Sequence, residues 1–420
     1  MSTILPFAAP RDGRPRVLAL MDYYLPGHKA GGPLRSISNL VESLGGEFDF
    51  WIIARDRDSG DAGPYCGVRV GEWQSLGRGQ VLYTPPGWRS AWMVARLLRS
   101  QQFDLVYLNS FFSRCFSMLP VWLAAMGLLP RHRILLAPRG EFAAGALSLK
   151  PWRKRLYLRL IHYLGIYRAV IWHASSNLEA SEILRIIGRD TRVRRALPLT
   201  RPHGRFPKVI TALDMPMSAG TTVSSLRTPK RANHLDVVFL SRISPSKNLH
   251  GALDILAGVD GDLDFHVYGP IEDQAYWDRC RHRAESFPAY VRFHYHGAVA
   301  HEQVPTVLAR HDLFFLPTLG ENYGHVILEA LLAGCPLLLS ERTPWRNLEE
   351  IGVGWDLPLD CPDLFRKRLE ACVRMPGADF AGYSENARHY GWGRATDKSV
   401  LEDNRQLLLK SLEEAVCASV

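Results

Sequence analysis

The spacing of hydrophobic residues predicts two successive series of alternating strands and helices. In the first series, short apolar runs typical of buried strands are separated by helix-length segments, and a helix is predicted over 34–44 that ends at Gly45-Gly46. The strands of this series are expected near 16–20, 50–54, 105–108, 134–137 and 170–173. Such alternation favours a parallel sheet covered by helices.

The alternation restarts after a polar stretch without periodicity over 217–232, which is typical of a linker. Strands are then expected at 235–240, 263–268, 291–295, 313–316 and 336–339, with a helix over 249–256. We therefore predict an N-terminal domain over 1–205, a linker over 206–232, a second domain over 233–389 and a helical tail over 390–420. Two doubly wound α/β domains bind ligands outside the carboxyl ends of their strands, so a cleft between the domains is the expected site.

Composition excludes several classes of protein. The chain has 420 residues, 47% hydrophobic and 22% charged, which is ordinary for a globular protein and excludes disordered and collagen-like chains. Seven scattered cysteines without a C-x-x-C pair indicate a reducing compartment and no thiolate metal site. The first 200 residues hold 27 Lys and Arg against 14 Asp and Glu, whereas the remainder holds 24 against 28. This asymmetry predicts an anionic partner for the first half alone.

Neither a signal peptide nor a membrane span is expected. The N-terminus lacks a basic region, and its apolar run is too short. The longest apolar stretch, 115–130, is shorter than the ~18 residues of a spanning helix and contains Pro120. A cytoplasmic protein is the prediction.

The most informative segment is 316–336. A strand ends at Pro317, a turn follows over 321–324, and a helix is predicted from about His325 to Ala333. Backbone amides at such a helix N-terminus form an anion site suited to a diphosphate. Glu321 and Glu329 frame this site, and Glu329 lies among apolar residues where an unpaired carboxylate is costly. The alternative is that Glu321 is an ordinary turn residue and Glu329 an ordinary residue on the surface of the helix.

Two cations lie in the loop after the strand at 235–240. Arg242 follows the strand directly and Lys247 precedes the next helix, so both can reach over the carboxyl edge of the sheet. The forked guanidinium of Arg242 and the compact charge of Lys247 suit binding of a diphosphate. The alternative is that both side chains are simply solvated in the loop. Trp345 is expected either beside this pocket or packed inside the domain.

These residues together carry a family resemblance. The order Ser241-Arg242, Lys247, Gly297, Glu321-x7-Glu329 and Ala333-Gly-Cys-Pro, with the loop Gly31-Gly32-Pro-Leu-Arg, resembles the family 4 retaining glycosyltransferases of the GT-B fold. The resemblance spans about residues 16–400. It implies two Rossmann-like domains facing across a cleft, with the acceptor bound by the first and the nucleotide sugar by the second. It also implies that the helical tail returns to the first domain.

The same resemblance implies residue roles. Arg242 and Lys247 would hold the donor diphosphate, and Glu329 would bind the ribose. Glu321 and the amides of the adjacent turn would contact sugar and phosphates, and two glycines would approach the donor from the other domain. The turn residues are Asn322, Tyr323 and Gly324, and the glycines are Gly31 and Gly32.

The resemblance further implies transfer without an enzyme nucleophile, metal or cofactor. The departing phosphate oxygen would accept the proton of the acceptor, while Arg242 and Lys247 replace the metal that other glycosyltransferases use. The catalytic residues would then be Glu321, Arg242 and Lys247.

One segment departs from the family pattern. Many members carry His-Gly where this chain has Pro138-Arg139-Gly140-Glu141, a form seen in a subset that builds surface polysaccharides. Arg139 and Glu141 are candidate acceptor or sugar contacts, and a structural loop pair bonded to backbone is the alternative.

Metal binding is not expected. Among the D-x-D triplets, Asp56/Asp58 is most simply a solvated loop, and Asp262/Asp264 alternates into a strand. His294, His296 and His301 are expected to be core or loop histidines, because no ligand set of usual spacing is present.

A basic segment over 150–165 interleaves cations with aromatic residues and leucines. Leu156, Leu160 and Leu164 share one helical stripe, and Arg153–Arg155 gather near its start. The stripe either faces the core of the first domain or rests on an anionic lipid surface.

The sequence therefore predicts a glycosyltransferase peripheral to the plasma membrane, using a UDP- or GDP-sugar donor and a glycan or polyprenyl-diphosphate-linked acceptor in polysaccharide, lipopolysaccharide or glycolipid synthesis. A nucleotide-sugar epimerase or hydrolase of the same fold is the alternative. A basic nucleic-acid-binding protein lacks any recognised motif, and a dehydrogenase lacks G-x-G-x-x-G.

Overall fold

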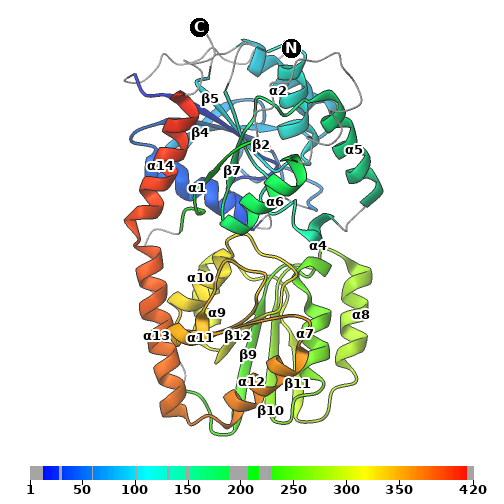
Figure 1. Ribbon diagram of the computed structural model, residues 1–420, viewed down its shortest axis with the longest axis vertical. Coiled ribbons are helices and arrows are strands. Elements are labelled where there is room, and N and C mark those ends of the chain that lie inside the picture. Colours follow the sequence, from blue (N-terminus) through cyan, green and yellow to red (C-terminus); the bar gives the residue numbers. More distant parts are fainter. Residues whose placement is uncertain are drawn as a thin grey trace. The chain divides into compact units, whose positions relative to one another are not determined.

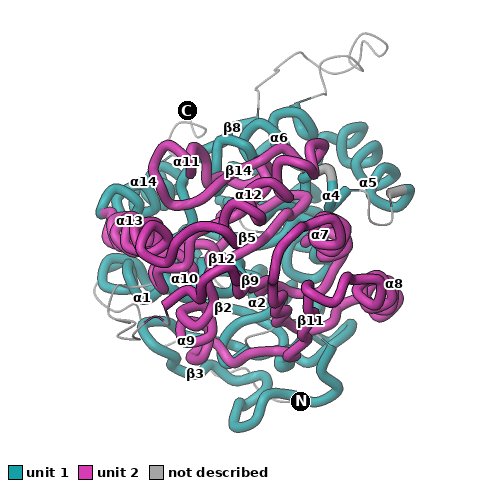
Figure 2. The backbone as a smooth tube through the Cα atoms, turned by 90° about the horizontal axis from the view of Figure 1, so that it is seen from below, with its two compact units in different colours: residues 1–215, 398–420 teal, residues 216–397 magenta. Residues whose placement is uncertain are grey.

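A computed structural model describes residues 13–27, 31–58, 60–100, 103–129, 133–147, 151–188, 207–216, 227 and 229–413. The chain divides into two compact units, shown in different colours in Figure 2. Unit 1 consists of Met1–Met215 with Lys398–Val420, and unit 2 of Pro216–Asp397. Of the linker predicted over 206–232, residues 206, 217–226 and 228 lie outside the described residues.

Unit 1 is built on an eight-stranded sheet in the order β3-β4-β2-β1-β5-β6-β7-β8, in which β3 alone runs antiparallel to its neighbour. The strands are β1 (Arg16–Leu20), β2 (Asp49–Arg55), β3 (Trp73–Leu76), β4 (Gly79–Thr84), β5 (Leu105–Asn109), β6 (Arg133–Ala137), β7 (Ile171–Ala174) and β8 (Lys208–Thr211). The central strands are buried on both faces, which explains why they read as continuous apolar runs.

Helices cover both faces of this sheet (Figure 1). One face packs against α1 (Gly32–Leu44) and α14 (Lys398–Glu413), and the other packs against the remaining long helices of unit 1. Those are α2 (Trp88–Ser100), α3 (Leu119–Ala125), α5 (Pro151–Leu164) and α6 (Asn177–Ile187), with the short helices η1 (Arg114–Met118) and α4 (Ala144–Leu147) between them.

Unit 2 contains a six-stranded parallel sheet in the order β11-β10-β9-β12-β13-β14. Its strands are β9 (His234–Leu240), β10 (Asp262–Tyr268), β11 (Val291–Tyr295), β12 (Leu313–Leu316), β13 (Leu337–Ser340) and β14 (Gly354–Leu357). The chain moves outward from β9 to β10 and β11, then returns to the other side of β9 with β12. The strand order therefore reverses between β9 and β12, where doubly wound sheets bind ligands.

The helices of unit 2 complete its two covering layers. They are η4 (Pro245–Lys247), α7 (Leu249–Leu256), α8 (Gln274–Ala284), η5 (His301–Gln303), α9 (Val304–Ala309), α10 (His325–Leu332), α11 (Leu348–Ile351), α12 (Pro362–Arg374) and α13 (Gly377–Ala395). Gly391 lets α13 approach α10 closely, because a Cβ there would lie 2.8 Å from Cβ of Leu331.

The C-terminal helix α14 belongs to unit 1, although α13 before it belongs to unit 2. Val400, Leu407 and Leu408 join the hydrophobic core beside α1. Asn404 Nδ2 donates a hydrogen bond to the carbonyl of Leu213 at 2.7 Å. These contacts make the end of the chain part of the first sheet's packing.

The predicted α/β class with two parallel sheets is confirmed, and the ranges 249–256, 291–295 and 313–316 match α7, β11 and β12. The prediction of a solvated loop around Asp56 and Asp58 is wrong. Both residues are buried, and Asp56 accepts a hydrogen bond from Arg57 Nε at 2.8 Å. In the part of the chain that the structure describes, no helix combines the length and the apolar character needed to cross a bilayer.

Candidate functional site

Two loops of unit 2 are joined where the strand order reverses. The loop after β9 and the loop after β12 leave neighbouring strands at the carboxyl edge of the sheet. The carbonyl of Ser246 accepts hydrogen bonds from the amide of Leu319 at 2.9 Å and from Oγ1 of Thr318 at 3.1 Å. Asn248, in a left-handed conformation, donates from Nδ2 to the carbonyl of Pro317 at 2.9 Å. The two loops therefore form one rigid rim.

An ion pair crosses this rim. Lys247 Nζ donates to Oε2 of Glu321 at 2.5 Å, and their side chains are only 13% and 16% exposed. The structure thus brings together a cation and a carboxylate that lie 74 positions apart in the sequence. Because so little of either side chain meets water, both charges have lost much of their solvation and depend on each other.

Arg242 lies on the other side of the same loop. Its guanidinium pairs with the carboxylate of Glu272, which follows β10, and not with Glu321. The backbone here is tightly packed, because a Cβ on Gly269 would lie 1.8 Å from the carbonyl oxygen of Ser241. The loop that carries Arg242 is therefore fixed against the loop after β10.

The turn before α10 presents a helix N-terminus at the rim. Gly324 adopts a φ of 76°, and a Cβ there would lie 2.6 Å from Ile327 Cδ1. Trp345 is buried and donates from Nε1 to the carbonyl of Tyr323 at 2.6 Å, so it holds the turn from behind. Nδ2 of Asn322 is buried without a hydrogen-bond partner in the described residues. Together these features leave polar N–H groups for an anionic ligand.

Glu329 is buried within α10, with its side chain 3% exposed. Oε1 lies 3.8 Å from Nδ1 of His301, which comes from η5. The sequence pattern pointed to Glu329, left His301 as a core or loop histidine, and gave Glu272 no role. Glu272 follows β10 and His301 in η5 follows β11, so their position at the carboxyl edge was the available signal.

The predicted glycine loop lies in unit 1. Gly31 precedes α1 with φ 73° and ψ −139°, a conformation that only glycine adopts readily, and Gly32 begins the helix. The proposed approach of these glycines to a donor stays a prediction.

Arg139 is inside unit 1 rather than at a surface. Its side chain is 4% exposed and pairs with Asp214. Its Nη2 also donates to Asn109 Oδ1 and to the hydroxyl of Tyr107, both at 2.9 Å. His173 completes this network, because its Nδ1 lies 2.6 Å from the same hydroxyl.

The carboxylate of Glu141 is likewise hydrogen-bonded within unit 1. It accepts hydrogen bonds from Ser110 Oγ at 2.7 Å and from the amides of Phe111 and Phe112 at 2.5 and 2.9 Å. Burial raises the pKa of this carboxyl, and the three hydrogen bonds oppose that rise. These contacts favour the structural alternative for Arg139 and Glu141.

Two family models match the chain. The model described as glycosyl transferases group 1 matches residues 225–353, and the model described as glycosyl transferase 4-like domain matches residues 31–200. The first match contains the joined loops, Lys247, Glu321 and Glu329. No curated protein sequence matches the chain.

Solved structures of the same architecture span nearly the whole chain. Anabaena HepE, solved in complex with UDP and glucose, is 16% identical with a TM-score of 0.62, covering 94% of this chain and 99% of HepE. Sucrose-phosphate synthase from Thermosynechococcus elongatus is 13% identical with a TM-score of 0.64, covering 97% and 100%. WaaG, a glycosyltransferase involved in lipopolysaccharide biosynthesis, is 14% identical with a TM-score of 0.60, covering 93% and 98%.

Fold and family together define the class as a glycosyltransferase with the GT-B fold. The chain belongs to the group 1 glycosyltransferases.

Proposed function

We propose that the protein is a retaining, metal-independent glycosyltransferase that takes its sugar from a UDP- or GDP-sugar. The observation that carries this proposal is the Lys247–Glu321 ion pair on the rim where β9 and β12 meet. It places a cation beside a helix N-terminus, which is the pairing that a diphosphate requires. The alternative of an epimerase or hydrolase has no comparable support from the family matches.

In the proposed reaction, the protein acts by charge neutralisation and positioning. Lys247, Arg242 and the amides at the start of α10 would stabilise the diphosphate as the bond to the sugar breaks. The departing phosphate oxygen would take the proton of the acceptor hydroxyl on the same face of the sugar. Glu321 would hold Lys247 in position before the donor arrives and contact the sugar afterwards, and Glu329 would accept hydrogen bonds from the ribose.

Calorimetric titration of the full chain with UDP and with GDP, each with EDTA present, tests the donor site and its metal independence. UDP is tested first because HepE was solved with UDP-glucose. Lys247→Ala should weaken binding at least tenfold, whereas Lys367→Ala, an exposed lysine of α12, should not. Binding of neither nucleotide to the wild-type chain, or equal binding by both variants, contradicts the assignment.

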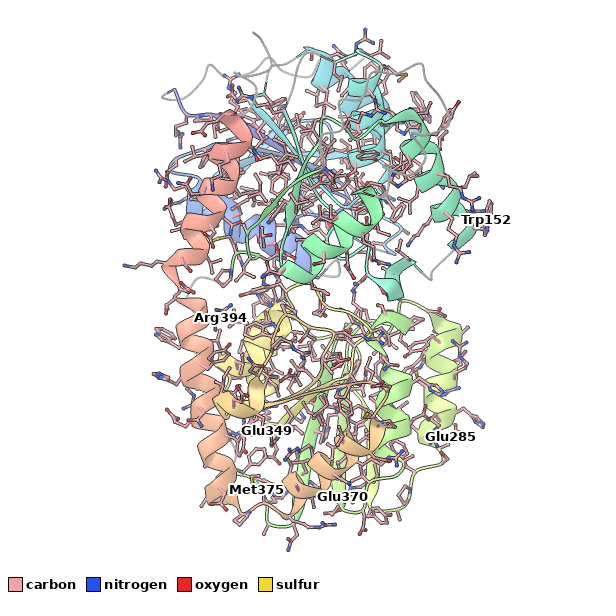
Figure 3. All side chains as sticks on the ribbon, viewed as in Figure 1. Trp152, Glu285, Glu349, Glu370, Met375 and Arg394 are labelled. Atoms are coloured by element: carbon pink, nitrogen blue, oxygen red, sulfur yellow. The ribbon has the colours of Figure 1, made fainter. Side chains whose placement is uncertain are left out.

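We also propose that the acceptor is a glycan or polyprenyl-diphosphate-linked sugar and that unit 1 meets it at an anionic membrane surface. The stripe on α5 supports this, because Leu156 and Tyr163 are 61% and 70% exposed, and Leu160 and Leu164 are exposed too. The side that packs on the core is the neighbouring one, where Ile161 is buried. Trp152, 65% exposed, projects from α5 as Figure 3 shows.

Cations and tryptophans are exposed on both α5 and α2. Arg153, Arg155 and Arg159 are exposed on α5. On α2, Trp88 and Trp92 are exposed beside further arginines, and Arg96 lies over the ring of Trp92 at 5.2 Å. Exposed aromatic residues next to cations are typical of surfaces that rest on anionic lipid. Lys154 is not part of this set, because its Nζ donates to the carbonyl of Ala146 at 2.7 Å.

Sedimentation with vesicles tests this surface. The wild-type chain should bind vesicles rich in phosphatidylglycerol at low salt and not bind pure phosphatidylcholine. Arg153→Gln/Arg155→Gln should weaken binding about tenfold or more, since each nearby cation adds roughly 1 kcal/mol. Arg281→Gln/Lys367→Gln removes the same charge from exposed positions of unit 2 and should have little effect. Equal loss by both variants refutes the role of α5.

These properties suit a cytoplasmic enzyme, peripheral on the inner face of the plasma membrane, in the synthesis of cell-surface polysaccharide, lipopolysaccharide or glycolipid. The positive first half of the chain and the exposed face of α5 support that location. We propose no nucleic-acid partner.

A further inference from the structure

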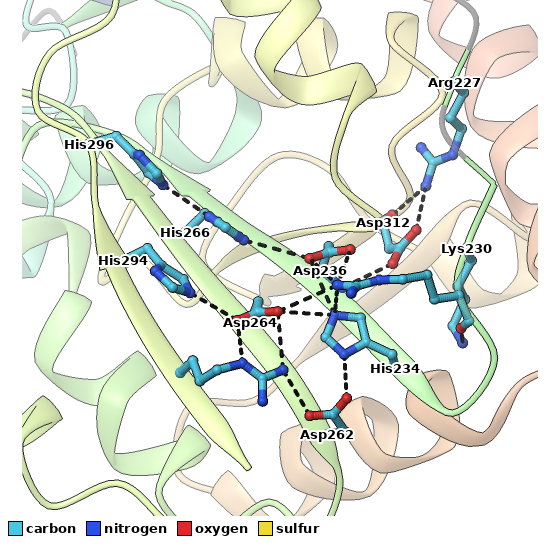
Figure 4. A network of polar contacts seen from close by, with 12 residues as sticks. Arg227, Lys230, His234, Asp236, Asp262, Asp264, His266, His294, His296 and Asp312 are labelled. Carbon is cyan, nitrogen blue, oxygen red and sulfur yellow. Dashed lines mark hydrogen bonds and ion pairs between the residues drawn. The ribbon is translucent and has the colours of Figure 1, made fainter. Parts of the chain in front are cut away.

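One face of the sheet in unit 2 carries an unusual concentration of histidine and aspartate. Along β9, β10 and β11 the residues alternate, so that leucine, valine and phenylalanine face α7 and α8 while polar side chains line the opposite face. The polar set is His234, Asp236, Asp262, Asp264, His266, Arg292, His294 and His296, and Figure 4 shows its contacts.

We propose that Asp264, His266 and His294 bind one divalent transition-metal ion of the zinc class. His266 and His294 are direct cross-strand partners on β10 and β11, and Asp264 precedes His266 by two positions on the same face. One ligand atom from each of the three residues lies within 4.8 Å of the others. This site is separate from the donor site and does not depend on it.

The local distances suit tetrahedral coordination. With metal–ligand bonds of about 2.0–2.1 Å, neighbouring ligand atoms of a tetrahedral zinc site lie about 3.3 Å apart. His294 Nε2 is 2.9 Å from Asp264 Oδ1, and His266 Nε2 is 3.6 Å from Asp236 Oδ1. Small rotations of Asp264, His266 and His294 bring these three ligands to one ion.

Neighbouring residues hold the ligands in orientation. His296 Nε2 shares a hydrogen bond of 3.0 Å with His266 Nδ1, which leaves Nε2 of His266 directed to the carboxylates. Arg292 donates to both oxygens of Asp264 at 2.7 and 3.1 Å. Such outer contacts to histidine and carboxylate ligands are general features of protein metal sites.

The charge and donor types select the ion. Asp236, Asp262 and Asp264 carry three negative charges, whereas Arg231 and Arg292 supply two positive ones. The face therefore retains negative charge when its histidines are neutral. Imidazole with carboxylate favours zinc, nickel or copper, whereas magnesium and calcium require more oxygen ligands.

Calorimetric titration of the untagged, EDTA-dialysed full chain with zinc chloride tests the proposal. We expect one ion per chain and a higher melting temperature with zinc. His266→Ala/His294→Ala should lose at least tenfold in affinity and keep UDP binding. His282→Ala/His389→Ala, which removes two exposed histidines of unit 2, should bind as the wild type does.

His294→Gln provides a second variant, because glutamine can still donate a hydrogen bond to Asp264. It decides the question if the double alanine variant fails to fold. Cobalt(II) added to the wild-type chain should give the visible absorption of a tetrahedral site, and His294→Gln should abolish it. Absence of zinc binding, retention of binding by His294→Gln, or equal loss in the control pair overturns the proposal.

Discussion

The Lys247–Glu321 pair allows a quantitative test of how the rim of the donor site is held. Removing one partner by Lys247→Met or Glu321→Gln leaves a charge or an unmatched polar group in a place where only about a seventh of each side chain meets water. At the observed 2.5 Å, an effective dielectric constant of about 20 gives a gross attraction of about 6–7 kcal/mol. Most of that attraction is offset by the desolvation of both groups.

The net cost of each single substitution should therefore be about 1–3 kcal/mol in the free energy of unfolding, below the 3–5 kcal/mol typical of fully buried pairs. Lys247→Met/Glu321→Gln should cost about 1 kcal/mol or less, because neither charge is left alone. Urea denaturation of the four proteins at pH 7 should give a coupling energy of about 1 kcal/mol or more, which is the sum of the two single costs less the cost of the double variant.

The same cycle on Arg368 and Glu349 is the control. Their charged atoms lie 2.6 Å apart, but the side chains are 39% and 54% exposed, so the coupling should be about 0.5 kcal/mol or less. Equal coupling in the two cycles refutes the reasoning that burial strengthens the Lys247–Glu321 pair. With donor present, Lys247→Met should lower kcat/KM about 100-fold or more, since an electrostatic contact in a site of this kind supplies about 2.7–4 kcal/mol.

Three further outcomes follow from the geometry. Gly269→Ala should destabilise unit 2 by about 2–5 kcal/mol, because the added Cβ meets the carbonyl of Ser241 and φ is 143°; unchanged urea denaturation contradicts this. Trp345→Phe should raise the KM for the donor several-fold by releasing the carbonyl of Tyr323, with little change in kcat, and steady-state kinetics decides it. Burial, and then the charge of Arg139, lower the pKa of His173 to about 4. Between pH 6.5 and 4 the unfolded chain therefore binds more protons than the folded chain. Because of this one histidine, the free energy of unfolding should fall by about 3 kcal/mol as the pH is lowered from 6.5 to 4. His173→Gln should flatten that dependence in denaturation series, and an unchanged slope argues against it.

The sequence alone could predict the helices and strands that are marked by a local hydrophobic pattern. The helix at 249–256 and the strands at 291–295 and 313–316 are apolar runs bounded by loops, and their limits could be predicted closely. Arg242, Lys247 and Glu321 could be named because they lie in loops that follow strands, and the family resemblance added the other donor residues. Their partners could not, since Lys247 meets Glu321 and Arg242 meets Glu272 only after the strand order is known.

Side-chain direction was harder to predict than element type. The alternation in 262–268 was visible, but His266 and His294 become neighbours through the parallel register of β10 and β11, which no local pattern contains. Asp56 and Asp58 looked like loop residues because their burial depends on distant elements. In each case, the missing information was which strand or helix packs next to which.

Because α14 belongs to unit 1, the two units are completed at different stages of synthesis on the ribosome. Unit 2, Pro216–Asp397, is one continuous stretch and is fully synthesised before the chain ends. Unit 1 is not, because Val400, Leu407 and Leu408 of its core are translated only after all of unit 2. Until they emerge, the apolar residues of α1 that share this core stay uncovered, and a chain that stops at Asp397 would lack this part of the unit 1 core while unit 2 is complete.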